Sequence, residues 1–386
     1  MPTDTSVKFI HSAMLGAPVL TGQAGSLIAV LDAVLVNGFG VGNVDSIVIA
    51  GGVATVTRSA GHPFEADAVA LIAGAAVTGG SVNGEQKVLA SPAPTATTWC
   101  FDAAGIANQT ATGTITQKVA PLGWTKAFTG TNVAVYKSSD PAATGCLLRV
   151  NDAGTTSARA VGYVSMTDVN TGVDAFPTEV QFAGGLYLPK SSTADAIARS
   201  WVLVGDGRLF YMPVARSNVS FEMYSTFGDF NSTRSPDPYG CVINGCTNAS
   251  LAVQQAEFDY GDSTGVAASV YCAKSYSGVG AAATMRKAFP VMYGSSVNSS
   301  GQGGRLAFPN YADGGLYVVQ HYLSEHATAV LRGTSPGLWV TPQSVGTAVF
   351  GNRDSVKGVT GLSGKTLRAI NSANGCYFFD VTGPWR

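Results

Sequence analysis

The segment from Asn43 to Val119 constrains the fold of this chain more than any other part of the sequence. Short runs rich in β-branched residues alternate apolar with polar positions there, which is the pattern of half-buried β-strands. Glycine-containing pairs separate the runs, most clearly Gly51-Gly52 and Asn83-Gly84. Such pairs favour tight hairpins, because a type I′ turn needs a positive φ at both central residues. We therefore predict a small all-β module, a sandwich or barrel, at residues 43–120.

A short helix is predicted before this module. Ser26 is a suitable N-cap, Leu27 to Val36 carries apolar residues at helical spacing, and Asn37-Gly38 supplies a stop. The preceding residues are rich in glycine and alanine, so residues 1–42 are interpreted as an N-terminal arm followed by the helix. We expect the apolar face of the helix to pack on the small module.

Residues 121–386 show many further strand patterns but no clear repeat or linker. A hairpin is indicated, for example, around Gly205-Asp-Gly207, where turn residues separate two apolar runs. We predict that these residues form one larger β-sandwich-like domain. The whole chain is thus predicted to be all-β.

The composition of the chain predicts a surface with few charged residues. Of the 386 residues, 46% are apolar and only 12% are charged, about half of the roughly 25% charged residues usual for soluble domains. With a net charge of −1, a free monomer would associate easily, so we expect neighbours, including copies of the same chain, to cover much of the surface. The absence of a basic patch argues against nucleic-acid binding.

The sequence also carries indications of compartment. No apolar run reaches the roughly 18 residues that a membrane-spanning helix needs, and the first residues lack the pattern of a secretory signal. We expect no membrane span, and folding in a cytoplasm. The six cysteines lack C-x-x-C spacing and are expected to be buried thiols, although a Cys241–Cys246 hairpin disulfide stays open for an oxidising medium.

Two sets of polar residues resemble catalytic or metal-binding groups. Asp152-x-Gly154 and Asp206-Gly207 fit turn chemistry better than catalytic carboxylates, because Asp-Gly pairs at strand ends usually form turns. His321 and His326 are five residues apart, whereas two ligands on one helical face are three or four apart. Neither set predicts a reactive site.

Two loops resemble ligand-binding motifs but are incomplete. Asp229 to Thr233 begins like a calcium loop, but Arg234 stands where that loop needs glycine. Gly358 to Thr366 approximates a phosphate-binding loop, but Val359 replaces its first glycine. We therefore predict no catalytic residues, no metal site and no cofactor, and the chain is not expected to be an enzyme.

One segment carries residues suited to recognition. Several aromatic residues lie there close to Arg and Asp, and such residues are enriched in protein interfaces and glycan-binding faces. The predicted interaction surface consists of Phe221, Tyr224, Phe227, Phe230, Arg234 and Tyr239. The alternative is that these aromatic side chains belong to the core of a sandwich.

Several segments resemble virion structural proteins of tailed bacteriophages. In the small module they are Val48 to Thr57, Gly61-His-Pro-Phe64, Asn83-Gly84, Ala111 to Thr116 and Ala120-Pro-Leu-Gly-Trp124. In the larger domain they are Leu148 to Arg159, Gly162 to Val169, Arg199 to Tyr211 and Phe378 to Arg386. The resemblance covers most of the chain and implies a structural subunit that assembles with other virion proteins in the host cytoplasm.

The resemblance leaves the role within the particle open. A tail or baseplate protein is favoured, and a capsid decoration protein is a close alternative. An adhesin component that binds a host-surface glycan through the aromatic segment is an alternative of a different class. A cell-wall hydrolase is disfavoured, because the sequence shows no acid pair or metal-ligand set.

Overall fold

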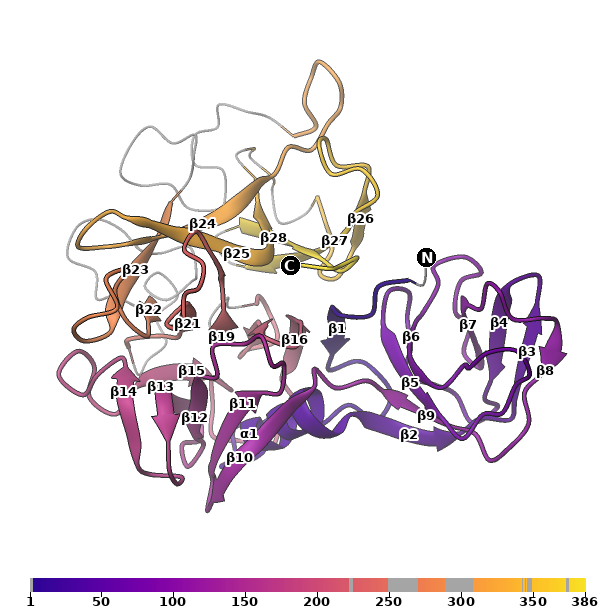
Figure 1. The fold of residues 1–386 in the computed structure, drawn as a ribbon, viewed down its shortest axis with the longest axis horizontal. Coiled ribbons are helices and arrows are strands. Elements are labelled where there is room, and N and C mark those ends of the chain that lie inside the picture. Colours follow the sequence, from indigo (N-terminus) through magenta and orange to yellow (C-terminus); the bar gives the residue numbers. More distant parts are fainter. Residues whose placement is uncertain are drawn as a thin grey trace.

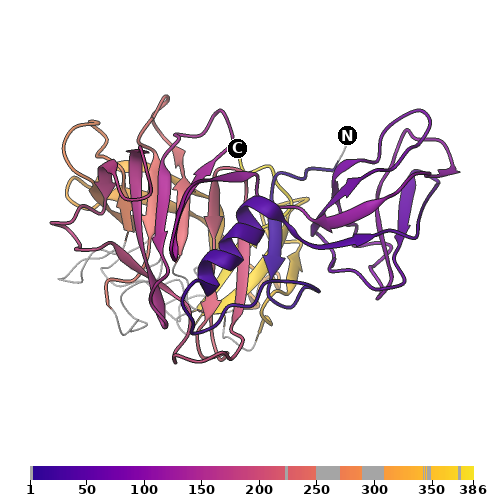
Figure 2. The ribbon, with the colours of Figure 1, turned by 90° about the horizontal axis from the view of Figure 1, so that it is seen from below.

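The computed structural model describes residues 3–221, 225–248, 270–288, 308–341, 343, 345, 349–372 and 375–386. Strands make up 43% of the structure and helix only 4%, so the prediction of an all-β chain with one short helix is confirmed (Figure 1). A small module projects from one side of a larger domain, as the views in Figures 1 and 2 show.

The small module, described throughout, is a sandwich of two four-stranded antiparallel sheets. Their strand orders are β2-β9-β5-β6 and β7-β4-β3-β8. The strands are β2 (Phe39–Asn43), β3 (Ser46–Ala50), β4 (Val53–Thr57), β5 (Val69–Ala73), β6 (Gly84–Lys87), β7 (Thr98–Asp102), β8 (Gln109–Thr110) and β9 (Thr116–Val119). Alternate residues of β3 and β4 are buried, so one face of their sheet lies against the core, as the sequence pattern predicts.

The two glycine-containing turns of the module differ. Gly51 and Gly52 have φ values of 59° and 79° and join β3 directly to β4, which confirms a tight hairpin there. Asn83-Gly84 forms no such turn, because β5 and β6 pair across the longer loop 74–83. The Asn83 side chain closes this loop by exchanging hydrogen bonds of 2.9 and 2.7 Å with the backbone of Ala75.

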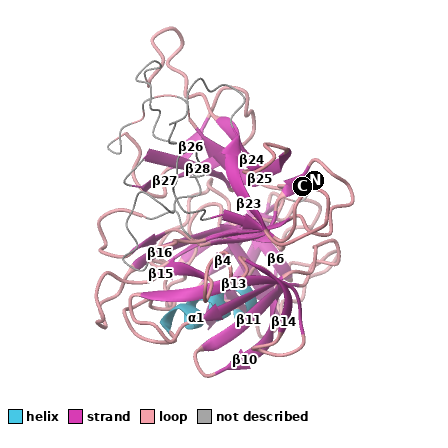
Figure 3. Cartoon of the chain, turned by 90° about the vertical axis from the view of Figure 1, so that its left-hand side faces the viewer, coloured by secondary structure: helices cyan, strands magenta, loops and turns pink. Residues whose placement is uncertain are grey.

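The larger domain consists, in its described residues, of a fourteen-stranded sheet and a six-stranded sheet. The large sheet runs β1-β16-β17-β19-β21-β22-β23-β24-β25-β28-β27-β26, with β18 on β16 and β20 on β25; the smaller runs β10-β11-β12-β13-β14, with β15 on β13. The two sheets lie in layers, with the helix (cyan) beside the smaller one (Figure 3). One apolar core, shared with the helix, lies on one side of the large sheet, and a second lies on its other side.

The strands of the larger domain have the following bounds: β1 (Lys8–His11), β10 (Trp124–Gly130), β11 (Val133–Ser138), β12 (Leu147–Asn151), β13 (Ser157–Met166), β14 (Gly172–Phe176), β15 (Leu186–Pro189), β16 (Ser200–Gly205), β17 (Leu209–Tyr211), β18 (Val214–Ala215), β19 (Thr226–Asp229), β20 (Asn231–Ser232), β21 (Cys241–Asn244), β22 (Val270–Cys272), β23 (Ala283–Ala288), β24 (Val319–Glu325), β25 (Leu331–Val340), β26 (Ser355–Lys357), β27 (Thr366–Ser372) and β28 (Gly375–Asp380).

The N-terminal segment is not a free arm. Strand β1 pairs antiparallel with β16, with Lys8 opposite Gly205 and His11 opposite Val202, and all four of its residues are buried. Further along, Leu20 bridges to Arg199. The interpretation of this segment as an arm is therefore wrong, because its short apolar run completes the edge of the large sheet.

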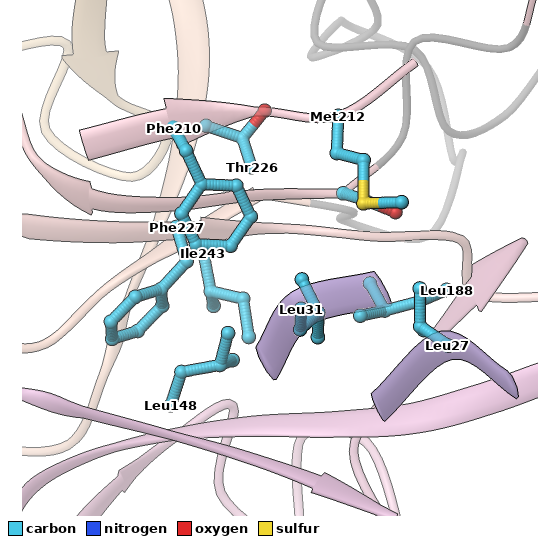
Figure 4. A pocket seen from close by; sticks show the side chains of 10 residues that line it. Leu27, Leu31, Leu148, Leu188, Phe210, Met212, Thr226, Phe227 and Ile243 are labelled. Atoms are coloured by element: carbon cyan, nitrogen blue, oxygen red, sulfur yellow. The ribbon is translucent and has the colours of Figure 1, made fainter. Parts of the chain in front are cut away.

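The helix belongs to the larger domain rather than to the small module. It comprises α1 (Ser26–Leu31) and a π-helical continuation, η1 (Asp32–Asn37). Leu27 and Leu31 project between the two sheets and pack with Leu148, Phe210 and Ile243 (Figure 4). The expectation that this apolar face packs on the module is wrong, since the facing sheets of the larger domain offer it a two-sided apolar environment.

The helix is capped from a distant part of the chain. The N-cap position is Gly25, not Ser26, and it offers no side-chain cap. Instead the Asp152 carboxylate accepts hydrogen bonds from the backbone N–H groups of Leu27 (2.8 Å) and Ile28 (3.1 Å). Asp152 lies in the connection between β12 and β13, where a turn was predicted, but its fully buried side chain caps a helix end 125 residues earlier in the chain.

Ionic contacts join the module to the larger domain. Lys8 on β1 pairs with Glu85 at 2.6 Å, and Arg368 on β27 pairs with Asp67 at 2.8 Å. Lys87 at the end of β6 is buried, and its ammonium donates to the backbone carbonyls of Val7 (3.2 Å) and Val381 (2.6 Å). This lysine thus ties the module to both ends of the chain.

The buried Lys87 predicts a pH dependence of stability. Burial lowers its pKa from 10.5 to about 8, against the partial compensation of Asp67, Asp4 and Asp380. The unfolded chain therefore binds one more proton than the folded chain between these values, so the free energy of unfolding rises as the pH increases through this window. The expected gain is about 3 kcal/mol at most.

This dependence is measured by urea unfolding of the wild type and of Lys87→Met at pH 7.5, 9 and 10. The difference in unfolding free energy between the two proteins should move in favour of the wild type as the pH rises. A difference that stays constant over the window would show that Lys87 keeps an ordinary pKa.

Candidate functional site

Most of the aromatic segment predicted as an interaction surface lies in the core. Phe221, Phe227 and Phe230 are all buried. Phe227 packs against Trp124 and Phe176, whereas Phe230, three residues further along, enters the core on the opposite side of the sheet. For these three residues the predicted exposure is wrong and the core alternative is right. Phe227 lies on β19, between β17 and β21, and Phe221 and Phe230 join the core on the other side of the large sheet. Tyr224 lies outside the described residues.

The other two predicted residues reach the surface, where they meet distant parts of the chain. Arg234 and Tyr239 are half-buried. The Arg234 guanidinium lies 5.5 Å from the centre of the Tyr276 ring and donates a hydrogen bond to the Tyr276 carbonyl. Tyr239 contacts Lys274, whose Nζ lies 5.2 Å from the ring centre. The predicted cation is thus part of an aromatic contact, but with a tyrosine 42 residues later in the chain.

Exposed apolar side chains lie on the two segments that contact Thr233 and Arg234. Tyr276 and Val279 lie on the turn after β22, Val330 directly precedes β25, and Leu331 is the first residue of β25, opposite Ser324. Their exposed fractions are 43%, 75%, 36% and 43%, respectively. The segments are joined by a hydrogen bond from the Thr233 hydroxyl to the Leu331 carbonyl (3.2 Å). We call Arg234, Tyr276, Val279, Val330 and Leu331 the Tyr276 patch.

A buried ion cluster lies under the Tyr276 patch and fixes its loops. Arg332 is fully buried, and its guanidinium pairs with Glu325 at 2.7 Å and with Asp237 at 2.9 Å. Glu325 also accepts the backbone N–H of Tyr276 and the hydroxyl of Thr328 (2.9 Å). The same guanidinium donates to the Lys274 carbonyl at 2.9 Å. These bonds hold the patch in one arrangement before any partner binds, which reduces the entropy lost on association.

The polar groups beneath the patch are bonded to one another and to the backbone. Both carboxylates that face Arg332 are already occupied by it and by neighbouring donors. In the part of the chain that the structure describes, no three His, Cys, Asp or Glu side chains are grouped so as to hold a metal ion. The buried His321 has its Nδ1 2.8 Å from the Ser335 hydroxyl, while His326 is exposed.

Two motifs of the sequence take the form of turns. Asp206 accepts the backbone N–H groups of Arg208 and Leu209, both at 2.8 Å, and so closes the β16–β17 hairpin as predicted. The loop 358–365 connects β26 to the antiparallel β27. A phosphate-binding loop instead leads from a strand into a helix, so this loop lacks the required context.

The cysteines are buried free thiols in this structure, including Cys241 and Cys246. Burial raises the pKa of Cys272 to about 12 and that of Cys376 to about 12. Because the thiolate is the reactive form of cysteine, these two side chains act as small apolar residues at neutral pH.

A small apolar cavity lies between the helix and the sheets (Figure 4). Leu27, Leu31, Leu148, Phe227 and Ile243 are among its lining residues, and its volume is about 10 Å³. A space of this size holds at most one water molecule, and its apolar walls offer such a water few hydrogen bonds. The cavity is a packing gap rather than a ligand site.

Comparison with known proteins adds no assignment. No protein-family model matches the chain, and no curated protein matches its sequence. None of the helices in the described residues has the length and apolar character needed to cross a membrane. The Tyr276 patch is therefore the candidate site on its geometry alone.

Sequence reasoning missed four of the five patch residues. Tyr276 and Val279 stand in a serine- and glycine-rich stretch that reads as an ordinary loop. Val330-Leu331 stands where β25 begins, so the sequence shows an ordinary apolar strand start there and gives no sign that the pair is exposed. Their meeting with Arg234 depends on the order of strands in the sheet, which local sequence patterns do not encode.

Proposed function

We propose that this chain is a structural subunit of a tailed-phage virion, located in the tail or baseplate, that acts through contacts with other virion proteins and with copies of itself. The observation that carries the proposal is the Tyr276 patch, an exposed apolar surface with a central arginine on a preorganised base. The resemblance of the sequence to phage structural proteins supplies the setting.

The composition of the patch supports protein–protein contact. Residues that contribute most to binding are enriched in Tyr and Arg and lie among apolar contacts that exclude water. In the Tyr276 patch the Arg234 guanidinium lies over the Tyr276 ring, with Leu331 adjoining. The chain has few charged residues, so little repulsion between molecules would oppose association through this surface.

Open sheet edges support association between copies. Strands β10 and β14 end the six-stranded sheet, and each pairs with a neighbour on one side only among the described residues. An unpaired edge offers backbone N–H and C=O groups to a strand of another chain. Lateral contacts of this kind suit a subunit that repeats around a symmetric particle.

The alternatives predict different stoichiometries and ligands. A capsid decoration protein would be present in far more copies per particle than a tail or baseplate protein, so quantitative mass spectrometry of purified particles distinguishes the two. The glycan-binding alternative has less support, because the three phenylalanines expected to form its platform are buried.

Replacing Tyr276 by alanine tests the proposed function. We expect incorporation of the subunit into particles to fall about tenfold or more, because truncation of a central interface tyrosine commonly costs 2 kcal/mol or more. Incorporation is measured by complementing a phage that lacks the gene and quantifying the subunit in purified particles. Folding is checked by thermal unfolding.

The matched control is Tyr311→Ala, which removes a tyrosine that is 97% exposed and lies outside the patch. This variant should be incorporated normally. If both variants assemble like the wild type, the patch is not the assembly surface. If the wild-type chain is absent from particles, the virion role itself is wrong.

A further inference from the structure

Lys190 and Asp152 form a fully buried pair inside the larger domain. Both side chains have an exposed fraction of 0%, and Lys190 Nζ lies 2.5 Å from Asp152 Oδ1. Asp152 directly follows β12 and Lys190 directly follows β15, and both strands pair with β13. The sheet therefore fixes the backbone at both residues.

Two backbone carbonyls accept hydrogen bonds from the Lys190 amine, and the Asp152 carboxyl is the third polar group close to it. Nζ donates to the carbonyl of Gln23 at 2.6 Å and to that of Gly154 at 2.9 Å. A neutral amine has two N–H groups, so these two carbonyls satisfy both, and its lone pair then faces the third close group, the Asp152 carboxyl. Asp152 Oδ1 is the carboxyl oxygen that lies close to Nζ, at 2.5 Å.

The other carboxyl oxygen of Asp152 lies between two backbone donors. Oδ2 accepts the N–H groups of Leu27 at 2.8 Å and Ile28 at 3.1 Å. Two backbone N–H groups on one carboxyl oxygen stabilise the negative charge that develops there when a nucleophile adds to the carbon. This arrangement therefore favours attack on Cγ of Asp152.

The environment also favours the uncharged forms of both groups. Burial raises the pKa of the Asp152 carboxyl, although Lys190 and the two N–H groups oppose this shift. Burial lowers the pKa of the Lys190 amine, although Asp152 opposes it. Transfer of one proton from the ammonium to the carboxylate removes two charges from a fully buried site, and leaves a nucleophilic amine beside a carboxylic acid.

We propose that Lys190 and Asp152 are joined by an amide bond between Nζ and Cγ, which forms spontaneously once the domain has folded. The amine attacks Cγ, and the negative charge of the tetrahedral intermediate resides on Oδ2. The Nζ–Cγ bond forms and the Cγ–Oδ1 bond breaks. Oδ1 leaves as water with its own proton and one proton from Nζ, so the step needs no oxidant and no cofactor.

The bond would link the end of β12 covalently to the end of β15 in the six-stranded sheet. Oδ2 becomes the amide oxygen and continues to accept the N–H groups of Leu27 and Ile28, while the remaining N–H still donates to one of the two carbonyls. Residues 152 to 190 become a closed loop that denaturants and mechanical load do not open. The inference is independent of the proposed virion role.

The test is the intact mass of the folded, purified full-length chain, measured under denaturing conditions. The expected mass is lower than the sequence mass by one water molecule, and proteolytic mapping should find the peptides that contain Asp152 and Lys190 joined together. The variants Lys190→Met and Asp152→Ala should both have the full sequence mass.

The peptide map keeps the test decisive. A cyclic imide at an Asp-Gly pair also loses one water, but mild base hydrolyses it and it joins no two peptides. Because an unfolded variant would also show the full mass, the wild type decides the outcome. A folded wild type with separate, unmodified peptides for Asp152 and Lys190 overturns the proposal.

Discussion

Replacement of Arg332 by alanine is expected to lower the free energy of unfolding by about 3–5 kcal/mol, because it leaves Glu325 and Asp237 buried without a counter-charge. The guanidinium is fully buried and makes three of the bonds that hold the loops under the Tyr276 patch. Guanidinium chloride unfolding of the wild type and the variant measures the loss.

The Arg208–Asp140 pair provides the matched control. It has a similar separation of 2.9 Å, but its side chains are 24% and 34% exposed. Water screens such pairs, so Arg208→Ala should cost about 1 kcal/mol or less. Equal losses for the two variants would mean that water also screens the Arg332 cluster.

A second experiment separates charge from packing at the same site. The triple variant Arg332→Met, Glu325→Gln, Asp237→Asn removes every charge of the cluster together. It should recover a large part of the stability lost in Arg332→Ala, because no unpaired charge stays buried. A triple variant that is less stable than Arg332→Ala would contradict this account.

Replacement of Leu31 by alanine is expected to cost about 3–4 kcal/mol, because it removes buried methyl groups and enlarges a gap that the surroundings only partly fill. Leu31 is buried between the two sheets of the larger domain and lines the existing cavity. Thermal or denaturant unfolding followed by the tryptophan signal of the larger domain measures the change.

Two variants bracket the effect of Leu31→Ala. Leu31→Met keeps the volume and should cost less than about 1.5 kcal/mol. Ile197→Ala shortens a side chain that is 59% exposed and should change stability by no more than about 0.5 kcal/mol. A loss for Leu31→Ala as small as that for Ile197→Ala would show that the helix is not part of the core.

The local structure of this chain follows from its sequence more closely than the long-range structure does. Gly51-Gly52 forms the predicted hairpin because both residues tolerate positive φ, a property of the residues themselves. The helix is also present where its spacing indicates. Its predicted packing partner, however, was the small module, whereas it packs between the sheets of the larger domain. An apolar stripe shows only that a helix is buried, and the nearest strands in sequence were not the strands that cover it.

The same distinction applies to the interaction surface. The sequence identifies the aromatic residues of the predicted segment, but it does not show whether one face or both faces of their strand are covered. Since neighbouring strands and the second sheet cover both, Phe227 and Phe230 became core residues. Tyr276 and Leu331 reach the surface only because β22, β24 and β25 come together in one sheet, a long-range pairing that no short motif records.

The pairing of Phe39 with Val119 closes the small module at its base, between η1 and β10. The eight strands of the module are therefore contiguous in the sequence, whereas the groups that bind Lys87 come from both ends of the chain. Strand β1 and the helix are synthesised earlier, yet β16 and β15 emerge long after them. The apolar side of the helix is therefore covered completely only after Leu148, Phe210 and Ile243 have been synthesised, with the whole module lying between them and the helix in the sequence.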